Sequence, residues 1–140
     1  WDLASGTNVS AELYKEDMYM EFKDLQHYPI LFVSALTKRR VSNVLEVAWE
    51  TFIKQRDKLS TKELNMWIEK AVRNYPPPAT QGKSIKIKFV EQVQQSPPIF
   101  ALFSNYPKLI SIQYLRYLHN QLRESFDLKG ITIKFSLRKG

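Results

Sequence analysis

Apolar residues in the first third of the chain form two stripes at helical spacing, separated by a short continuous apolar run. The first stripe comprises Tyr14, Met18, Phe22 and Leu25, and the second comprises Val41, Val44, Leu45, Ala48, Trp49 and Phe52. Residues 30–33 are all apolar, which is typical of a buried parallel strand, and loops are predicted at residues 3–10 and 34–37. Helix, buried strand, loop and helix are the repeating unit of an α/β sheet. The pattern predicts an α/β fold with Trp49 in its core.

A different pattern begins after residue 58, and we predict a domain boundary between residues 58 and 59. Ser60 and Glu63 have the spacing of a capping box, which marks the first turn of a helix. The apolar stripe of this helix comprises Leu64, Trp67, Ile68, Ala71, Val72 and Tyr75. The prolines at residues 76–78 end the helix, because proline lacks the backbone N–H and clashes with the preceding turn.

Alternating apolar and polar residues dominate the rest of the chain. One strand is predicted where Ile85, Ile87 and Phe89 point inward and Lys86 and Lys88 point outward. A second strand follows at residues 99–103, then a helix with the stripe Leu115, Leu118, Leu122 and Phe126. The last strand, residues 131–138, places its isoleucines, Phe135 and Leu137 inward and Lys134 and Arg138 outward. Residues 59–140 are therefore expected to form an α+β domain of order α-β-β-α-β, with the helices on one face of a three-stranded sheet.

The positive charge of the chain is concentrated in its second part. The net charge is +7, and residues 60–140 hold 13 Lys and Arg against 5 Asp and Glu, a balance of +8. Residues 1–59 hold 8 Lys and Arg against 9 Asp and Glu, a balance of −1. Such an excess indicates a polyanion partner or a well-solvated basic surface. If the predicted strands share a sheet, Lys86, Lys88, Lys134 and Arg138 form a cationic patch and are the candidate RNA-binding residues.

Composition excludes several other classes of function. The chain has no cysteine, which excludes disulfides and thiolate metal sites and fits a reducing cytosol. His27 and His119 have no acidic or histidine partners at ligand spacing, so no metal site is predicted. No apolar run reaches membrane-spanning length, and the N-terminus has no signal-peptide pattern. The chain starts without a methionine, and we interpret it as a fragment.

Asp2 and the Ser34-Ala35-Leu36 loop have the chemistry that a guanine base requires. A carboxylate offers two acceptors for the N1–H and N2–H₂ donors of guanine, and a backbone N–H in a tight loop can donate to O6. Both strings are common in unrelated proteins, so these residues alone do not distinguish a guanine site from ordinary loops.

The chain resembles the C-terminal portion of the Der/EngA family of tandem GTPases over nearly its whole length. Trp1-Asp2 is similar to the end of the Asn-Lys-x-Asp guanine-specificity motif, and residues 30–37 are similar to a later guanine-contacting strand and loop. The family's terminal domain is matched in order and spacing by residues 74–78 (Asn-Tyr-Pro-Pro-Pro), 86–89, 92–93, 97–105 (Pro-Pro-Ile-Phe-Ala-Leu-Phe-Ser-Asn), 114–118, 122–126 and 130–133.

The resemblance implies the end of a second GTPase domain at residues 1–58, with Asp2, Ser34, Ala35 and Leu36 contacting guanine, and a KH-like domain at residues 59–140. It also implies a cytoplasmic bacterial parent protein that binds GTP or GDP with Mg²⁺ and acts in assembly of the large (50S) ribosomal subunit. The chain itself contains no G-x-x-x-x-G-K-[ST] phosphate loop. We therefore expect no catalytic residue, no bound cofactor and no GTP hydrolysis in this chain alone.

Three departures from the family pattern bear on function. Lys38, Arg39 and Arg40 stand where the family often has glycines, and residues 89–93 differ from the usual Tyr-Ala-Thr-Gln-Val. The four glycines, Gly6, Gly82, Gly130 and Gly140, form no Gly-x-x-Gly loop, the element with which KH domains clamp RNA.

Two further functions remain open at this point. The KH-like domain can instead be an interaction domain that docks on the upstream GTPase domains of the same parent chain and gates them without contacting RNA. The chain can also be an unrelated nucleic-acid-binding protein.

Overall fold

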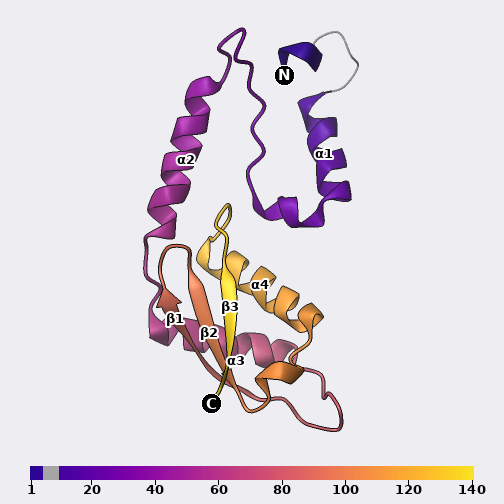
Figure 1. The fold of residues 1–140 in the computed structure, drawn as a ribbon, viewed down its shortest axis with the longest axis vertical. Coiled ribbons are helices and arrows are strands. Elements are labelled where there is room, and N and C mark those ends of the chain that lie inside the picture. The colour runs from indigo at the N-terminus through magenta and orange to yellow at the C-terminus, as the bar shows by residue number, and fades with distance from the viewer. Residues whose placement is uncertain (5–9) are drawn as a thin grey trace. The chain divides into compact units, whose positions relative to one another are not determined.

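The computed structural model describes residues 1–4 and 10–140, so residues 5–9 of the first predicted loop lie outside the described residues (Figure 1). The chain forms two compact units. Unit 1 comprises Trp1–Lys54 and Lys129–Ile131, and unit 2 comprises Gln55–Leu128 and Thr132–Gly140.

Unit 1 contains helices and an extended segment. Its elements are η1 (Asp2–Ala4), α1 (Ala11–Glu21), η2 (Lys23–His27) and most of α2 (Val41–Gln55). Ser10 caps α1, since its side chain accepts a hydrogen bond of 3.1 Å from the Leu13 N–H. The two predicted helices are therefore confirmed, with the first stripe divided between α1 and η2.

Two predictions for unit 1 are wrong. Residues 30–33 are extended but pair with no strand among the described residues. A strand is defined by its ladder of hydrogen bonds, so an apolar run forms one only beside a partner. Trp49 is 63% exposed rather than buried, and it packs against Phe52 at 5.7 Å between ring centroids. None of the described residues of α2 is buried, and its apolar side chains Val44, Leu45 and Phe52 are exposed as well.

Unit 2 has the predicted α-β-β-α-β order. Its elements are α3 (Thr61–Asn74), β1 (Ile87–Gln94), β2 (Ile99–Ser104), η3 (Pro107–Leu109), α4 (Ile112–Phe126) and β3 (Lys134–Lys139). The strand order is β1-β2-β3, with β1 antiparallel and β3 parallel to β2. In Figure 1 the strands cross in front of α3, in agreement with helices that cover one face of the sheet. The predicted α+β class is confirmed.

The core of unit 2 lies between this sheet and its helices. Its buried residues include Leu64, Trp67, Ile68 and Ala71 of α3 and Leu118 and Leu122 of α4, all from the predicted helical stripes, and Val90, Phe100 and Leu102 of the sheet. Tyr114 of α4 is buried as well, although the predicted stripe began at Leu115, which is only half-buried. Ile133 of unit 2 is buried as predicted, and so is Ile131, which belongs to unit 1, although β3 begins only at Lys134.

Side chains also tie α3 to its neighbours by hydrogen bonds. The Tyr114 and Tyr117 hydroxyls donate to the carbonyls of Tyr75 and Ala71, each at 2.8 Å, near the C-terminal end of α3. The Ala71 carbonyl also accepts from the Tyr75 N–H, so the Tyr117 hydroxyl adds a second bond to it. Ser60 precedes the first helical residue as predicted, but its side chain makes no capping hydrogen bond. Burial raises the pKa of the Tyr114 hydroxyl well above its ordinary value.

The inward face predicted for β1 is wrong after residue 88. The register with β2 shifts between Ile87 and Phe89, which is a β-bulge at Lys88. A bulge sets two residues of one strand opposite a single residue of the other, so the alternation of faces changes phase. Val90 and Gln92 are consequently buried, and Phe89 is 40% exposed. The Gln92 side chain accepts a hydrogen bond of 2.8 Å from the Leu59 N–H.

Candidate functional site

The structure brings together two of the four predicted guanine-contacting residues, although 32 positions separate them. The Ser34 hydroxyl donates a 2.5 Å hydrogen bond to Oδ1 of Asp2. Trp1 places Asp2 there, because its ring packs edge-on against Phe32 at 4.5 Å and Tyr14 at 5.9 Å. An aromatic cluster in unit 1 thus holds the N-terminal residues beside the extended segment.

Ser34 also organises the loop that contains the other two predicted residues. Its hydroxyl oxygen accepts a hydrogen bond from the Thr37 N–H at 3.2 Å, and its own N–H donates to the Arg39 carbonyl at 3.2 Å. Ala35 and Leu36 lie exposed in this turn, with Leu36 81% exposed. Ser34 itself is buried, so one buried hydroxyl fixes both the carboxylate and the exposed turn.

The hydrogen bond from Ser34 lowers the pKa of the Asp2 carboxyl, and a backbone hydrogen bond adds to the effect. Hydrogen bonds to the charged form of an acid favour that form. Asp2 is therefore a carboxylate at neutral pH, the form that accepts hydrogen bonds from a base.

Lys38, Arg39 and Arg40 continue this loop. Lys38 and Arg40 have φ angles of 57° and 59°, in the left-handed region that glycine adopts without strain. These two side chains therefore lie at backbone positions that favour glycine.

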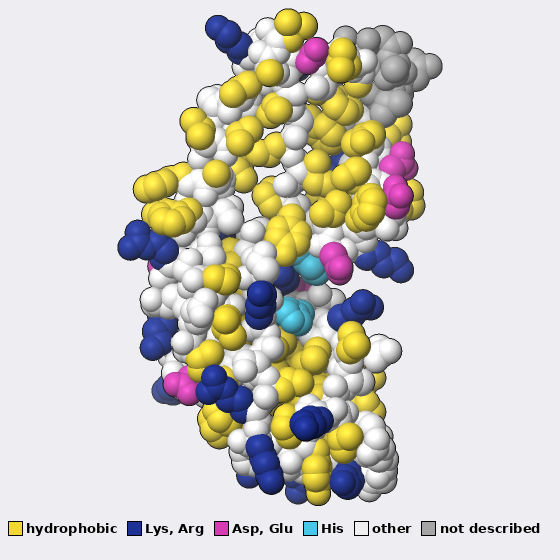
Figure 2. All heavy atoms as spheres, viewed as in Figure 1, with side chains coloured by type: hydrophobic (Ala, Val, Ile, Leu, Met, Phe, Trp, Pro, Cys, Tyr) yellow, Lys and Arg dark blue, Asp and Glu magenta, His cyan; other side chains and the backbone are white. Residues whose placement is uncertain are grey.

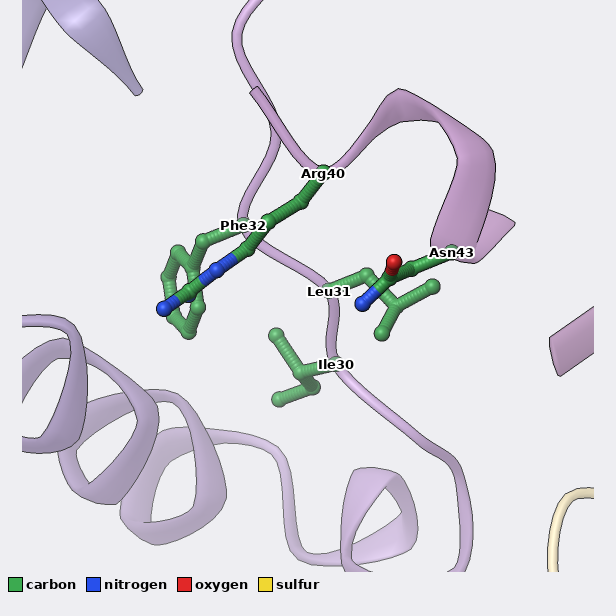
Figure 3. Close-up of a pocket in the computed structure, with 5 residues that line it drawn as sticks. All are labelled: Ile30, Leu31, Phe32, Arg40 and Asn43. Carbon is green, nitrogen blue, oxygen red and sulfur yellow. The ribbon is translucent and has the colours of Figure 1, made fainter. Parts of the chain in front are cut away.

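A hollow of ≈ 320 Å³ lies beside the loop in unit 1, lined by Ile30, Leu31, Phe32, Arg40 and Asn43 (Figure 3). Figure 3 shows the Arg40 side chain extended alongside the Phe32 ring. The lining includes none of the predicted guanine-contacting residues. This hollow is mainly apolar and is distinct from the Asp2–Ser34 pair.

All four predicted RNA-binding cations are exposed in unit 2. As predicted, Lys134 and Arg138 lie on the face of β3 opposite to Phe135 and Leu137. Lys134 and Arg138 are about 13 Å apart along the strand. Lys88 is the bulged residue of β1, and Lys86 precedes that strand. The four cations therefore do not form one regular patch: two share the open face of the sheet, one lies at its bulge and one lies before it.

Aromatic side chains on this open face were missed by the sequence analysis. Phe89 and Phe103 are register partners whose rings stack at 4.1 Å between centroids, with planes 14° apart. Arg138 is the partner of Phe103 on the other side, and its guanidinium carbon lies 5.9 Å from the Phe103 ring centroid. Apolar alternation gives no sign of this row, because the bulge that exposes Phe89 leaves no mark in the sequence pattern.

Basic and hydrophobic side chains share this side of unit 2. Figure 2, seen from the same side as Figure 1, shows Lys and Arg side chains interspersed with hydrophobic ones over the strands, with few acidic side chains. Glu91 is the acidic member of the open face, since its register partner Ala101 lies between Phe100 and Leu102 of the inward face. A surface of this kind attracts polyanions and offers apolar contacts to them.

No described helix is long and apolar enough to cross a membrane. Within residues 1–4 and 10–140, no group of three or more His, Asp or Glu is arranged to hold a metal ion.

Comparison with known proteins gives a consistent family match. The family described as "KH-domain-like of EngA bacterial GTPase enzymes, C-terminal" matches residues 58–138. Proteins named GTPase Der are similar over almost the whole chain: 39% identical in Amoebophilus asiaticus and 37% in Flavobacterium johnsoniae, each over 99% of this chain and 32% of the relative. The relative from Fusobacterium nucleatum is 41% identical over 97% of this chain and 31% of its own length. The chain thus spans about a third of the relatives that it matches.

Proposed function

The chain belongs to the family of KH-domain-like C-terminal domains of EngA bacterial GTPases, and from this premise we propose that it serves a GTP-binding factor in assembly of the large ribosomal subunit. In this proposal unit 2 contacts ribosomal RNA through its basic open face. Residues 1–58 are the end of the second GTPase domain of a cytoplasmic parent protein, and residues 59–140 are its KH-like domain.

The observation that carries the RNA proposal is the charge of unit 2 combined with the exposure of its cations. Residues 60–140 have a balance of +8, and Lys86, Lys88, Lys134 and Arg138 are all exposed. The sequence contains no Gly-x-x-Gly loop, so the contacts are to phosphates along this surface rather than through the usual KH clamp.

The proposal includes a guanine-contacting role for unit 1 in the parent protein. The Asp2 carboxylate accepts from N1–H and N2–H₂ of the base, and the backbone of the Ala35–Leu36 turn donates to O6. The Ser34–Asp2 hydrogen bond supports this role, because it holds the carboxylate next to that turn in its ionised form. GTP or GDP and Mg²⁺ bind mainly through residues of the parent protein outside this chain.

The test is the salt dependence of RNA binding by a variant in which Lys86, Lys88, Lys134 and Arg138 are all changed to Gln. For single-stranded RNA each lost phosphate contact lowers the slope of log K against log salt by about 0.7, so four contacts lower it by about 3. Affinity falls for many RNA sequences alike, and melting temperature changes little, because exposed substitutions have small effects on stability.

A matched control removes the same charge from the helical side of unit 2. Lys62, Lys70, Arg73 and Arg116 are exposed on α3 and α4, and their change to Gln leaves affinity nearly as in the unaltered chain. An equal loss of RNA affinity in both variants would contradict the assignment of RNA binding to the open face of the sheet. If only GTP turnover of the full-length protein changes in the first variant, while RNA affinity and salt slope stay constant, the domain gates the GTPase domains without binding RNA.

A further inference from the structure

The open face of the sheet carries a row of three side chains that cross all its strands. Phe89 of β1, Phe103 of β2 and Arg138 of β3 are consecutive register partners. The two rings are stacked at 4.1 Å, and the guanidinium lies 5.9 Å from the centre of the second ring. Phe89, at the edge of the sheet, remains 40% exposed.

The exposure of Phe89 in this row results from the bulge at Lys88. With regular alternation from Ile85 onward, Phe89 would point inward beside the core residues. The register shift between Ile87 and Phe89 instead turns Phe89 to the open face and Val90 to the core. Bulges interrupt the strand ladder and often redirect one side chain at a binding site. Here the redirected side chain is a large aromatic ring that completes a stack with Phe103.

The two rows next to it carry small residues, one carboxylate and one cation. The next row along the strands contains Ala101 and Ser136, with Glu91 at the β1 edge, and the row after it contains Ile99 and Lys134. Arg138 and Lys134 thus stand at the β3 ends of two rows, about 13 Å apart along that strand. Rings at one side and cations at the other match the two parts of a nucleotide: a flat base and a charged phosphate.

We propose that this face is a stacking platform for unpaired bases of single-stranded RNA. Bases stack on the exposed surface of the Phe89–Phe103 pair, while Arg138 and Lys134 contact phosphates of the same strand. Aromatic side chains bind bases in this way with little dependence on sequence, because every base has a π-face. Bases in a duplex already stack on one another, so the platform selects single-stranded segments. This inference rests on the proposed RNA-binding function and names the form of RNA that it takes.

The test uses the 140-residue chain and a single-stranded RNA of about 12 nucleotides, within the range of known single-strand site sizes, that carries 2-aminopurine at its centre. Stacking on an aromatic ring quenches the fluorescence of this base. The variant combines Phe89→Leu and Phe103→Leu, which keep apolar side chains but remove both rings. The control is Tyr106→Leu, since Tyr106 is also exposed and also has a cation over its ring, Lys83 at 5.1 Å, but lies beyond the end of β2.

We expect the unaltered chain and the Tyr106 variant to quench the probe and to bind the RNA with similar Kd. The double variant should lose the quenching and bind about 5- to 100-fold more weakly, the range expected for loss of a stacked base. Its salt slope should stay unchanged, because no cation is lost. The same RNA as a duplex should bind more weakly and respond to neither variant.

Three results would overturn the inference. If the double variant binds and quenches like the unaltered chain while the Lys/Arg→Gln variant loses affinity, RNA is held by phosphate contacts alone, and only the stacking mode fails. Equal weakening by Tyr106→Leu shows that the face has no special role. If the unaltered chain shows no salt-dependent binding, the proposed function itself fails.

A second measurement applies if the double variant does not fold. Abasic sites are introduced into the RNA and titrated against the unaltered chain. Removal of the bases should weaken binding by the same 5- to 100-fold range, and equal affinity for abasic and intact RNA would refute stacking.

Discussion

Asn65 joins α3 to the edge strand of the sheet, and its removal gives the sharpest test of how unit 2 is held together. Val90 lies in β1, which has β2 on one side and no strand of the sheet on the other. The Val90 N–H donates to Oδ1 of Asn65 at 3.0 Å, and Nδ2 of Asn65 donates to the Val90 carbonyl at 3.1 Å. One side-chain amide thus replaces a missing strand at this point of the edge.

The expected cost of Asn65→Ala follows from these contacts. Each hydrogen bond contributes about 0.5–1.5 kcal/mol net, and a buried group left without a partner costs about 1–3 kcal/mol. Val90 is 0% exposed, so its backbone groups lose their partner in a buried position. Alanine recovers about 0.6 kcal/mol through its higher helix propensity. The two groups together cost about 2–6 kcal/mol, so the net loss in free energy of unfolding should be about 1.5–5 kcal/mol.

The assay is urea unfolding followed by circular dichroism, with Asn120→Ala as the matched control. Asn120 is exposed within α4, so its substitution should change the free energy of unfolding by no more than about 0.6 kcal/mol, the amount that alanine gains in helix propensity. A loss below that limit for Asn65→Ala would refute the argument that the amide completes the sheet edge.

Three further predictions concern the residues of unit 1 and the activity of the chain. The 140-residue chain should release no phosphate from GTP above the buffer rate, because it has no phosphate loop; turnover that persists through further purification would refute this. Asp2→Asn in the full-length protein should weaken GTP binding and favour xanthine nucleotides, since an amide donor then faces the base donors; unchanged GTP affinity at that domain would show that Asp2 does not read the base. Ser34→Ala should raise the pKa of Asp2 toward its ordinary value, measured by NMR titration of its carboxyl group. A carboxyl whose pKa is lowered in the folded state stabilises the fold at pH values above its unfolded pKa, and this contribution is lost as the pH falls through the folded pKa. The Ser34→Ala variant should therefore lose less stability than the unaltered chain between neutral and acidic pH. An unchanged pKa of Asp2 in the variant would exclude Ser34 as the cause of the lowered value.

Local patterns in the sequence predicted most of unit 2. The apolar stripes of both helices face the core as expected, from Leu64 to Ala71 in α3 and at Leu118 and Leu122 in α4. Helical spacing alone decides which side of a helix is apolar. The predicted strand at residues 99–103 corresponds to β2, and Lys134 and Arg138 lie on the open face. In the last strand the alternation is regular, so the face on which each residue lies follows from the order of residues.

Features that depend on a partner could not be predicted in the same way. The exposure of Phe89 is set by the shift of β1 against β2, and no residue near Lys88 marks that shift. Residues 30–33 have the composition of a buried strand, but a strand requires another to pair with. Trp49 lies in a correct helix, yet burial depends on what covers the apolar face of that helix. The Ser34–Asp2 hydrogen bond links positions 32 apart, and only the resemblance to the GTPase family placed them together.

NMR titration of the labelled 140-residue chain with single-stranded RNA tests the central claim most directly, because it locates the contact without any substitution. The largest amide shift changes should occur at Phe89, Phe103 and Arg138, with smaller ones at Lys134 and little change along α3 and α4. Changes centred on Lys70, Arg73 and Arg116 of the helical side, or no change at RNA concentrations that saturate other single-strand binders, would contradict an RNA-binding role for the open face of the sheet.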